Sequence, residues 1–303
     1  SYYDGYSFHT FRDDPDGVSV LSTNRILNIQ PTAANNVWCI TQDRKLYLYD
    51  THLCQFLKTS NQINEKFKVD FRADNIYDIN GGNTWVTSAN ADYLLRTNDT
   101  DVLDFELIHV GQKGLKSGKV YFIYGDKKHR EWILTDKGTT IYGKKFSTPV
   151  PYKWIREVGE YVFLATENGK VIVVDEKNRA TNVPLPEGIT HINELKNTGY
   201  QLLLATNLGV VIYNPRTFKS EIINIQSPSQ PLAEVKKLYV DDYGMVWTFT
   251  NGMGVTLVNP KTSEKRWLFA DQPDPVDRTS SSKLFITQDE NHTVWVVPNQ
   301  GTF

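Results

Sequence analysis

This sequence of 303 residues has few cysteines, no long apolar run and no large excess of charge of either sign. Only two cysteines occur, Cys39 and Cys54, so a disulfide scaffold is excluded, and no CxxC spacing indicates a metal site. We expect both thiols to be structural and unpaired. The formal net charge of −2 gives no long-range attraction to nucleic acid or to an anionic membrane. This segment is therefore not expected to bind nucleic acid.

Signals for membrane insertion or secretion are also missing. No apolar stretch reaches the roughly 20 residues that a membrane-spanning helix needs. The first residues, SYYDGYSFHTF, lack the basic and apolar regions of a signal peptide and do not begin with Met. We therefore expect a mature or excised segment that is attached to a membrane only through another part of the protein.

Motifs of common enzymes are absent as well. The six histidines form no HExxH motif and no i, i+4 pair, and neither a GxSxG nor a Walker sequence occurs. The stretch NGGNTW is glycine-rich, but no helix pattern follows it, so phosphate would find no helix N-terminus there. We expect no catalytic residue, no metal and no cofactor in this chain.

A recurring unit takes the place of such motifs. In VWCIT, TWVTS, EWILT, VFLAT, LLLAT and VWTFT, a large aromatic or apolar residue precedes a hydroxyl residue by three positions, and VWVVP is a seventh copy ending in Pro. A polar loop and a second β-branched run follow, as in KLYLYD, and a further strand and turn precede, as in VKKLYVDDYGMVW. No long segment with helical periodicity interrupts these units. The repeated positions are Trp38, Trp85, Trp132, Phe163, Leu203, Trp247 and Trp295.

About four strands in about 43 residues is the size of a propeller blade. The sequence therefore predicts an all-β fold, a seven-bladed β-propeller with four-stranded antiparallel blades, in which residues 1–303 form a single domain. Each small sheet has two apolar faces, and radial packing buries them against neighbouring blades. We expect the repeated residues to form the core between blades, with sugar stacking as the alternative for the tryptophans.

The two ends of the chain are predicted to share the last blade. The sequence stops at VWVVPNQGTF, partway through the seventh unit, and SYYDGYSFHTF at its start looks like the strands that this unit lacks. N-terminal strands that complete the last blade would close the ring. The alternative is a chain that continues past Phe303.

The stretches YYDGYSFHTFRDDPDGVSVLSTNRI, VWCITQDRKLYLYD and VKKLYVDDYGMVWTFTNGMGVTLVNPKT resemble the two-component regulator propeller repeat. The resemblance covers essentially the whole chain and is strongest in the first, sixth and seventh units. The family usually has Gly between the Trp and the Thr, whereas this chain has larger residues there, which implies repacked blades. The Gly-His and Trp-Asp signatures of WD repeats are absent.

This resemblance implies the periplasmic sensor region of a hybrid two-component system, with the histidine kinase outside the segment and no reaction in the chain itself. It implies a glycan-derived oligosaccharide as the ligand. Adjacent propeller or β-sandwich domains of the same protein, or a second copy in a homodimer, are the implied partners. The alternatives are a propeller-type polysaccharide lyase or glycoside hydrolase, with acids or arginines at the channel mouth, and a pure protein-interaction scaffold.

Ligand-binding residues are expected in two sets of loops, those between second and third strands and those that enter each innermost strand. In a propeller both sets surround one end of the central channel. Arg25 and Arg44 are favoured for a carboxylate or sulfate group, because a guanidinium forms paired bonds with planar anions. The alternative for each candidate is a solvated turn residue. The candidates are Asn24, Arg25, Asp43, Arg44, Asp136, Glu167, Asn207, Asn251 and Asn299.

Neighbouring carboxylates in the turn DDYG need a separate interpretation. We expect Asp241 and Asp242 to form the turn, since Asp bonds its own backbone and Gly supplies a positive φ. Metal binding is the alternative.

Overall fold

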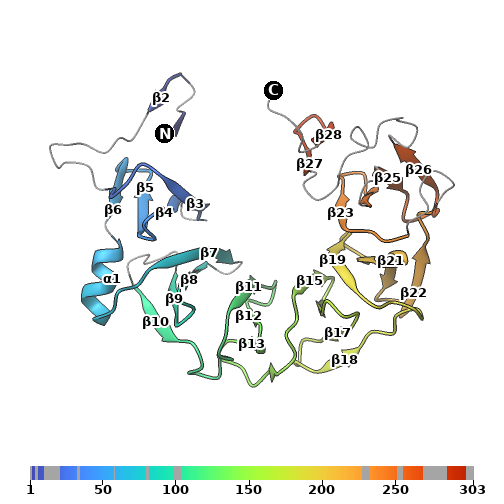
Figure 1. Cartoon of the computed structure of the whole chain (residues 1–303), viewed down its shortest axis with the longest axis horizontal. Coiled ribbons are helices and arrows are strands. Elements are labelled where there is room, and N and C mark those ends of the chain that lie inside the picture. The colour runs from blue at the N-terminus through green and yellow to red at the C-terminus, as the bar shows by residue number, and fades with distance from the viewer. Residues whose placement is uncertain are drawn as a thin grey trace. The chain divides into compact units, whose positions relative to one another are not determined.

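The computed structural model describes residues 2–3, 6–9, 21–32, 35–57, 59–79, 82–98, 104–226, 233–250, 255–268 and 285–297. The chain divides into two compact units, Ser1–Pro151 and Tyr152–Phe303. In each unit the chain forms a series of small antiparallel sheets, one after another (Figure 1).

The first unit holds a short hairpin and three four-stranded blades. The hairpin is β1 (Tyr2–Tyr3) and β2 (Phe8–His9). Blade 1 is β3 (Ile26–Pro31), β4 (Asn36–Thr41), β5 (Leu46–Asp50) and β6 (Gln55–Leu57). Blade 2 is β7 (Ala73–Ile79), β8 (Asn83–Ser88), β9 (Tyr93–Asn98) and β10 (Glu106–His109). Blade 3 is β11 (Val120–Gly125), β12 (Glu131–Thr135), β13 (Gly138–Ile141) and β14 (Ser147–Thr148).

The second unit holds three more four-stranded blades and a final pair of strands. Blade 4 is β15 (Trp154–Val158), β16 (Tyr161–Ala165), β17 (Val171–Val174) and β18 (Ala180–Asn182). Blade 5 is β19 (Ile192–Asn197), β20 (Leu202–Thr206), β21 (Gly209–Asn214) and β22 (Lys219–Ile223). Blade 6 is β23 (Lys237–Val240), β24 (Val246–Phe249), β25 (Val255–Val258) and β26 (Lys265–Leu268). The final pair is β27 (Phe285–Gln288) and β28 (Val294–Val297).

Every blade pairs its strands antiparallel and in chain order, which is the topology of a β-propeller blade. The prediction of an all-β, seven-bladed propeller is confirmed, with six blades as four-stranded sheets and β27–β28 as the described part of the seventh. Completion of that blade by the N-terminal strands stays a prediction, because β1 pairs with β2 and β27 pairs with β28. The single-domain interpretation also stays a prediction.

One short helix lies between two repeats, where the sequence pattern indicated none. Helix α1 (Thr59–Phe67) lies between blades 1 and 2, and the side chain of Ile63 is fully buried in their shared core. Thr59 Oγ1 donates a 2.6 Å hydrogen bond to Leu46 O, and Leu46 N donates a 2.7 Å bond to Ser60 Oγ. These contacts fasten the helix to β5. Its apolar stripe is too sparse to stand out in a sequence pattern, so tertiary contacts stabilise it. No helix in the described ranges is long and apolar enough to cross a membrane.

The repeated large residues form most of the core between blades. Trp38 packs with Ile76 and Val86 of the next blade, and Phe163 packs with Leu195 in the second unit. The side chains that are 0% exposed are those of Trp38, Trp85, Trp132, Phe163 and Leu203. Trp247 is half-buried, and Trp295 is 54% exposed. In the part of the seventh blade that is described, Trp295 has no third or fourth strand beside it.

Candidate functional site

The predicted convergence of two loop sets at one end of the blades is present in both units. In the first unit, Gln42 N bonds Arg25 O and Ala73 N bonds Arg44 O, both at 2.8 Å. The loop between β4 and β5 therefore contacts the entry to β3 and the entry to β7. In the second unit, Ile192 N donates a 2.9 Å bond to Glu167 O in the same way. We call this end of each unit the strand-entry face.

A basic residue stands immediately before the innermost strand of each of the six four-stranded blades. The first strands of consecutive blades lie side by side within each unit, β3 with β7, β7 with β11, β15 with β19 and β19 with β23. The entries to these strands are therefore neighbours within each unit. The basic residues at the entries are Arg25, Arg72 and Lys119 in the first unit and Lys153, His191 and Lys236 in the second.

Polar side chains on the strand-entry face of the first unit hold one another in place. Arg44 Nη1 lies 2.6 Å from Asp74 Oδ1, which links blade 1 to blade 2. Arg25 Nη1 donates a 3.2 Å bond to Gln42 Oε1. Burial disfavours the charged form of Asp43, but hydrogen bonds from Thr41 and other neighbours outweigh it and hold the pKa of this carboxyl below its usual value. The face thus presents arginine and ionised carboxylate groups in fixed positions.

The second unit has a tighter cluster around Glu234. Its Oε1 lies 2.5 Å from His191 Nε2, 2.6 Å from Lys236 Nζ and 3.1 Å from Asn193 Nδ2. Burial would raise the pKa of Glu234, but hydrogen bonds from Lys236, His191 and Asn193 lower it to about 2. Asn207 Oδ1 accepts a 3.4 Å bond from His191 N. The cluster joins the entries of blades 5 and 6.

The sequence candidates are distributed as follows. Arg25, Asp43, Arg44, Glu167 and Asn207 belong to the contacts described above. Asp136 lies on the strand-entry face of blade 3, where Asp136 N donates a 3.0 Å bond to Lys119 O. Asn24 lines a separate pocket on blade 1, and Asn251 and Asn299 lie outside the described residues.

Several residues of the strand-entry face were missed by the sequence analysis. They are Arg72, Lys119, Lys153, His191, Glu234 and Lys236. The basic residue before each innermost strand is a sequence signal. It precedes the large residue of the second strand by 13 positions in blades 1 to 3 but by 10, 12 and 11 positions in blades 4 to 6, so alignment on the large residue does not bring all six basic residues to one position.

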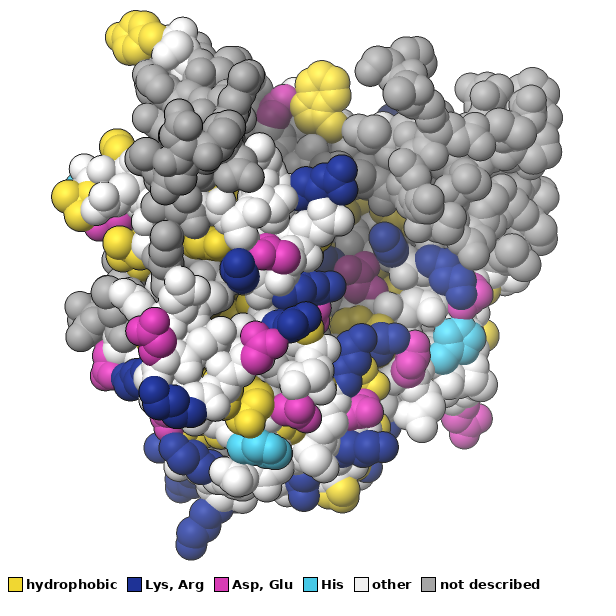
Figure 2. Space-filling model, turned by 60° about the vertical axis from the view of Figure 1, so that its left-hand side comes forward, with side chains coloured by type: hydrophobic (Ala, Val, Ile, Leu, Met, Phe, Trp, Pro, Cys, Tyr) yellow, Lys and Arg dark blue, Asp and Glu magenta, His cyan; other side chains and the backbone are white. Residues whose placement is uncertain are grey.

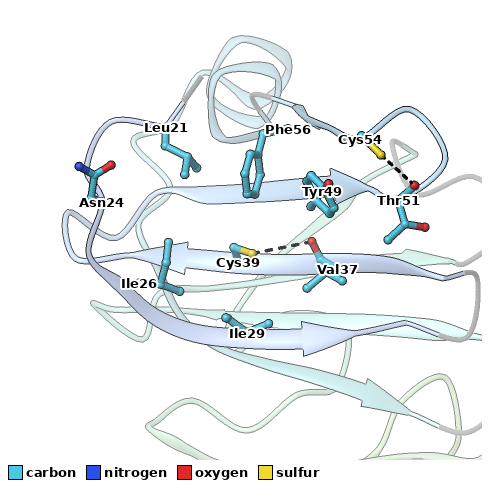
Figure 3. A pocket seen from close by; sticks show the side chains of 10 residues that line it. All are labelled: Leu21, Asn24, Ile26, Ile29, Val37, Cys39, Tyr49, Thr51, Cys54 and Phe56. Atoms are coloured by element: carbon cyan, nitrogen blue, oxygen red, sulfur yellow. Dashed lines mark hydrogen bonds between the residues drawn. The ribbon is translucent and has the colours of Figure 1, made fainter. Parts of the chain in front are cut away.

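A second cavity lies on blade 1 and has a different character (Figure 3). It has a volume of about 380 Å³, and Val37, Cys39, Tyr49 and Phe56 are among its mostly apolar lining residues. The matching face of blade 2 carries Val86 and packs in the same core cluster as Trp38. Among the described residues of the first unit, no further blade packs on this face of blade 1, so the cavity is an apolar blade face rather than an enclosed site.

Both cysteines line this cavity as free thiols, as predicted. Burial raises the pKa of Cys39 to about 11. The thiolate is the reactive form of cysteine, so Cys39 is inert at neutral pH.

Asp241 forms the turn as predicted, whereas Asp242 contacts a residue of the next blade instead of its own backbone. Asp241 Oδ1 accepts bonds from Tyr243 N and Met245 N at 3.0 and 2.9 Å, while Asp242 Oδ2 lies 2.8 Å from His292 Nδ1. No group of three His, Cys, Asp or Glu side chains within the described ranges is arranged to hold a metal ion.

Charges of both signs are interspersed on the side of the molecule in Figure 2, where basic and acidic side chains alternate without a large patch of one sign. This pattern agrees with the small net charge. Such a surface creates no strong long-range field that would attract ligands of one charge.

Comparison with known proteins shows the fold. No family model matches the sequence, and no curated protein matches it. Virginiamycin B lyase from Staphylococcus aureus is 11% identical, with 90% of this chain and 91% of the lyase covered and a TM-score of 0.51. YCF48 from Cyanidioschyzon merolae is 10% identical, with coverages of 90% and 92% and a TM-score of 0.51.

An extracellular domain from a hybrid two-component system of B. thetaiotaomicron is also similar. It is 20% identical, and the match covers 97% of this chain but 42% of that longer chain, with a TM-score of 0.48. At these identities the likenesses concern the fold alone.

Proposed function

We propose that this chain is the ligand-binding propeller of the extracytoplasmic sensor in a hybrid two-component signalling protein, and that it binds a glycan-derived oligosaccharide without transforming it. The repeat resemblance supports the protein class. The ligand would sit on the strand-entry face. The observation that carries this part is the basic side chain before the innermost strand in all six four-stranded blades.

The chemistry of that face suits a sugar with acidic groups. Arg44, fixed by Asp74, and Lys236, fixed by Glu234, offer charged donors whose positions are set before the ligand arrives. Asn193 and Asn207 hold Glu234 and the entry to β19 in place through their side-chain amides. The proposal includes a periplasmic location, attachment through domains outside this chain, and adjacent propeller or β-sandwich domains or a second copy as partners. Signalling would require a ligand that binds two arrangements of those domains with different affinities.

Thermal unfolding and calorimetry with defined oligosaccharides test this proposal. The panel should contain neutral, uronate-containing and sulfated members. Ligand at 100 times its Kd stabilises the folded chain by about 2.7 kcal/mol, so a clear rise in Tm is expected for at least one anionic member. Arg44→Gln should weaken that binding, and Lys68→Gln, an exposed lysine beyond α1, is the matched control. Binding that is unchanged in Arg44→Gln, or absent for the whole panel, contradicts the proposal.

A lyase is the second candidate function, and the pair of His191 and Glu234 is the observation that favours it. A carboxylate 2.5 Å from Nε2 can orient an imidazole that transfers protons. In the S. aureus virginiamycin B lyase, an H270A variant is catalytically inactive. Incubation with quinupristin and with uronate polysaccharides, followed by mass spectrometry, separates the two functions. Product that forms with the native chain and disappears in His191→Ala would establish the lyase and exclude the binding-only role.

A further inference from the structure

Phe218 is a large apolar side chain at a position where the fold does not need one. Its side chain is 65% exposed, and its φ of 58° lies in the left-handed region that bulky residues avoid. It ends the turn Asn214–Phe218 between β21 and β22, in which Phe218 N donates a 2.9 Å bond to Asn214 O. The exposure of the ring and the backbone conformation are both unfavourable for folding. Phe218 therefore does not stabilise the turn, and a role in binding would explain its presence.

Blade 6 contains the same turn with a serine in place of the phenylalanine. The sequences are NPRTF and NPKTS, and Ser263 has a φ of 60°. Ser263 N donates a 2.9 Å bond to Asn259 O, as Phe218 N does to Asn214 O. The turn geometry therefore forms without an aromatic ring.

Phe218 lines a pocket of about 190 Å³ that lies between blades 4 and 5. Tyr161 also lines it and is 37% exposed. Tyr213 is 2% exposed and packs edge-on against Phe163 with ring centroids 5.7 Å apart, so this part of the wall is fixed. The turns that carry Tyr161 and Phe218 lie at the end of the blades opposite the strand-entry face, because successive antiparallel strands reverse direction.

A guanidinium group completes the wall of this pocket. Asp175 Oδ2 accepts bonds from Arg179 Nε at 2.8 Å and lies 2.7 Å from Arg179 Nη2. A hydrogen bond from Arg179 N is the main reason why the pKa of Asp175 lies below its usual value, so the carboxylate stays ionised. Arg179 is thereby held in one orientation although its side chain is 73% exposed. The remaining lining residues are Val173, Thr181, Asn182 and Pro184.

The size and chemistry of the pocket define its ligand. The volume equals that of about six water molecules at roughly 30 Å³ each, which admits one six-membered ring but no helix about 10 Å wide. The aromatic rings of the wall can pack against an apolar face of a ligand. The polar groups of Arg179, Thr181 and Asn182 can form hydrogen bonds with polar groups at the edge of the same ligand. A pyranose ring has both. We propose that this pocket binds a single pyranose ring, as a carbohydrate site separate from the strand-entry face.

Saturation-transfer NMR with methyl glycosides of glucose, galactose, mannose and N-acetylglucosamine tests the proposal on the full chain. At least one glycoside should receive saturation on its ring protons, with a Kd in the millimolar range expected for one ring. Phe218→Ser should reduce this affinity at least tenfold without lowering Tm, because blade 6 forms the turn with serine. Arg179→Lys should also weaken binding, since lysine lacks the planar fork.

Two controls make the outcome specific. Ser263→Phe places the same ring on the matching turn of blade 6 and should leave the affinity unchanged. Lys68→Gln, at an exposed residue outside both sites, should leave it unchanged as well. The sensing proposal is tested by Arg44→Gln with anionic oligosaccharides and this one by Phe218→Ser with neutral glycosides, so their failures are distinguishable. Absence of transfer to every glycoside, or undiminished binding in Phe218→Ser, would overturn the proposal.

Discussion

The indole Nε1 of Trp247 donates a 2.8 Å hydrogen bond to Oδ2 of Asp241, six residues earlier in the chain. The other oxygen of Asp241 accepts the turn amides between β23 and β24. Trp132 bonds Asp126 at 2.9 Å and Trp295 bonds Asp289 at 2.8 Å with the same spacing. One carboxylate therefore ties a hairpin turn to the tryptophan of the next strand, and this tie recurs in three blades.

Removal of this carboxylate should lower the free energy of unfolding most in the blade where the carboxylate is buried. Asp126 is 0% exposed and also lies 2.5 Å from Arg130 Nε, so Asp126→Ala removes a carboxylate that binds a buried guanidinium and a buried indole. We expect a loss of about 3 kcal/mol in the free energy of unfolding. Urea denaturation measures it. Asp289→Ala removes the same carboxylate from a more exposed setting and should lower the free energy of unfolding by clearly less; equal losses would contradict this explanation.

Blade 1 has the same turn with a threonine in place of the aspartate. Thr32 N bonds Asn36 O at 2.9 Å and Asn36 N bonds Thr32 Oγ1 at 3.3 Å, as Asp241 does with its own turn. The shorter side chain of Thr32 accepts no hydrogen bond from the indole of Trp38. The buried Nε1 of Trp38 has no acceptor in the part of the chain that the structure describes. Thr32→Asp should supply one and raise stability by about 1 kcal/mol. The control compares Trp38→Phe with the double variant that adds Thr32→Asp. A gain in stability between these two variants would contradict the mechanism, because no indole is present to donate the bond.

The sequence predicts the repeat, the strand order within blades and the buried large residues, because all of these follow from local pattern and from the need to bury two apolar faces. It does not predict helix α1, whose Thr59 and Ser60 are fixed by Leu46 of a neighbouring strand. Likewise, the bonds of Glu234 with His191 and Asn193 join residues more than 40 positions apart. Such polar contacts depend on the three-dimensional packing of blades, which no spacing along one unit encodes.

The Glu234 cluster should make stability depend on pH in the acid range. The folded pKa of Glu234, about 2, lies below the value near 4.3 of an unfolded chain. Its contribution is therefore fully present above pH 4.3 and is lost as the pH falls toward 2. Because the side chain is 31% exposed, we expect the contribution to be about 1 kcal/mol. Glu234→Gln should flatten this part of the curve of unfolding free energy against pH, whereas Glu167→Gln, at a carboxylate that is 69% exposed, should not; an unchanged slope in Glu234→Gln would contradict the assignment.

The two thiols should differ in reactivity although both line the apolar cavity of blade 1. Cys39 is 5% exposed with a pKa of about 11, so little thiolate forms and reagent has little access, whereas Cys54 is exposed. Iodoacetamide at pH 8 should add one group to the folded chain and two groups in denaturant, as measured by intact mass. In Cys54→Ser the folded chain should stay unlabelled over the same period. Rapid labelling of Cys39 in that variant would mean that β4 becomes accessible in solution, which contradicts the burial of the Cys39 side chain.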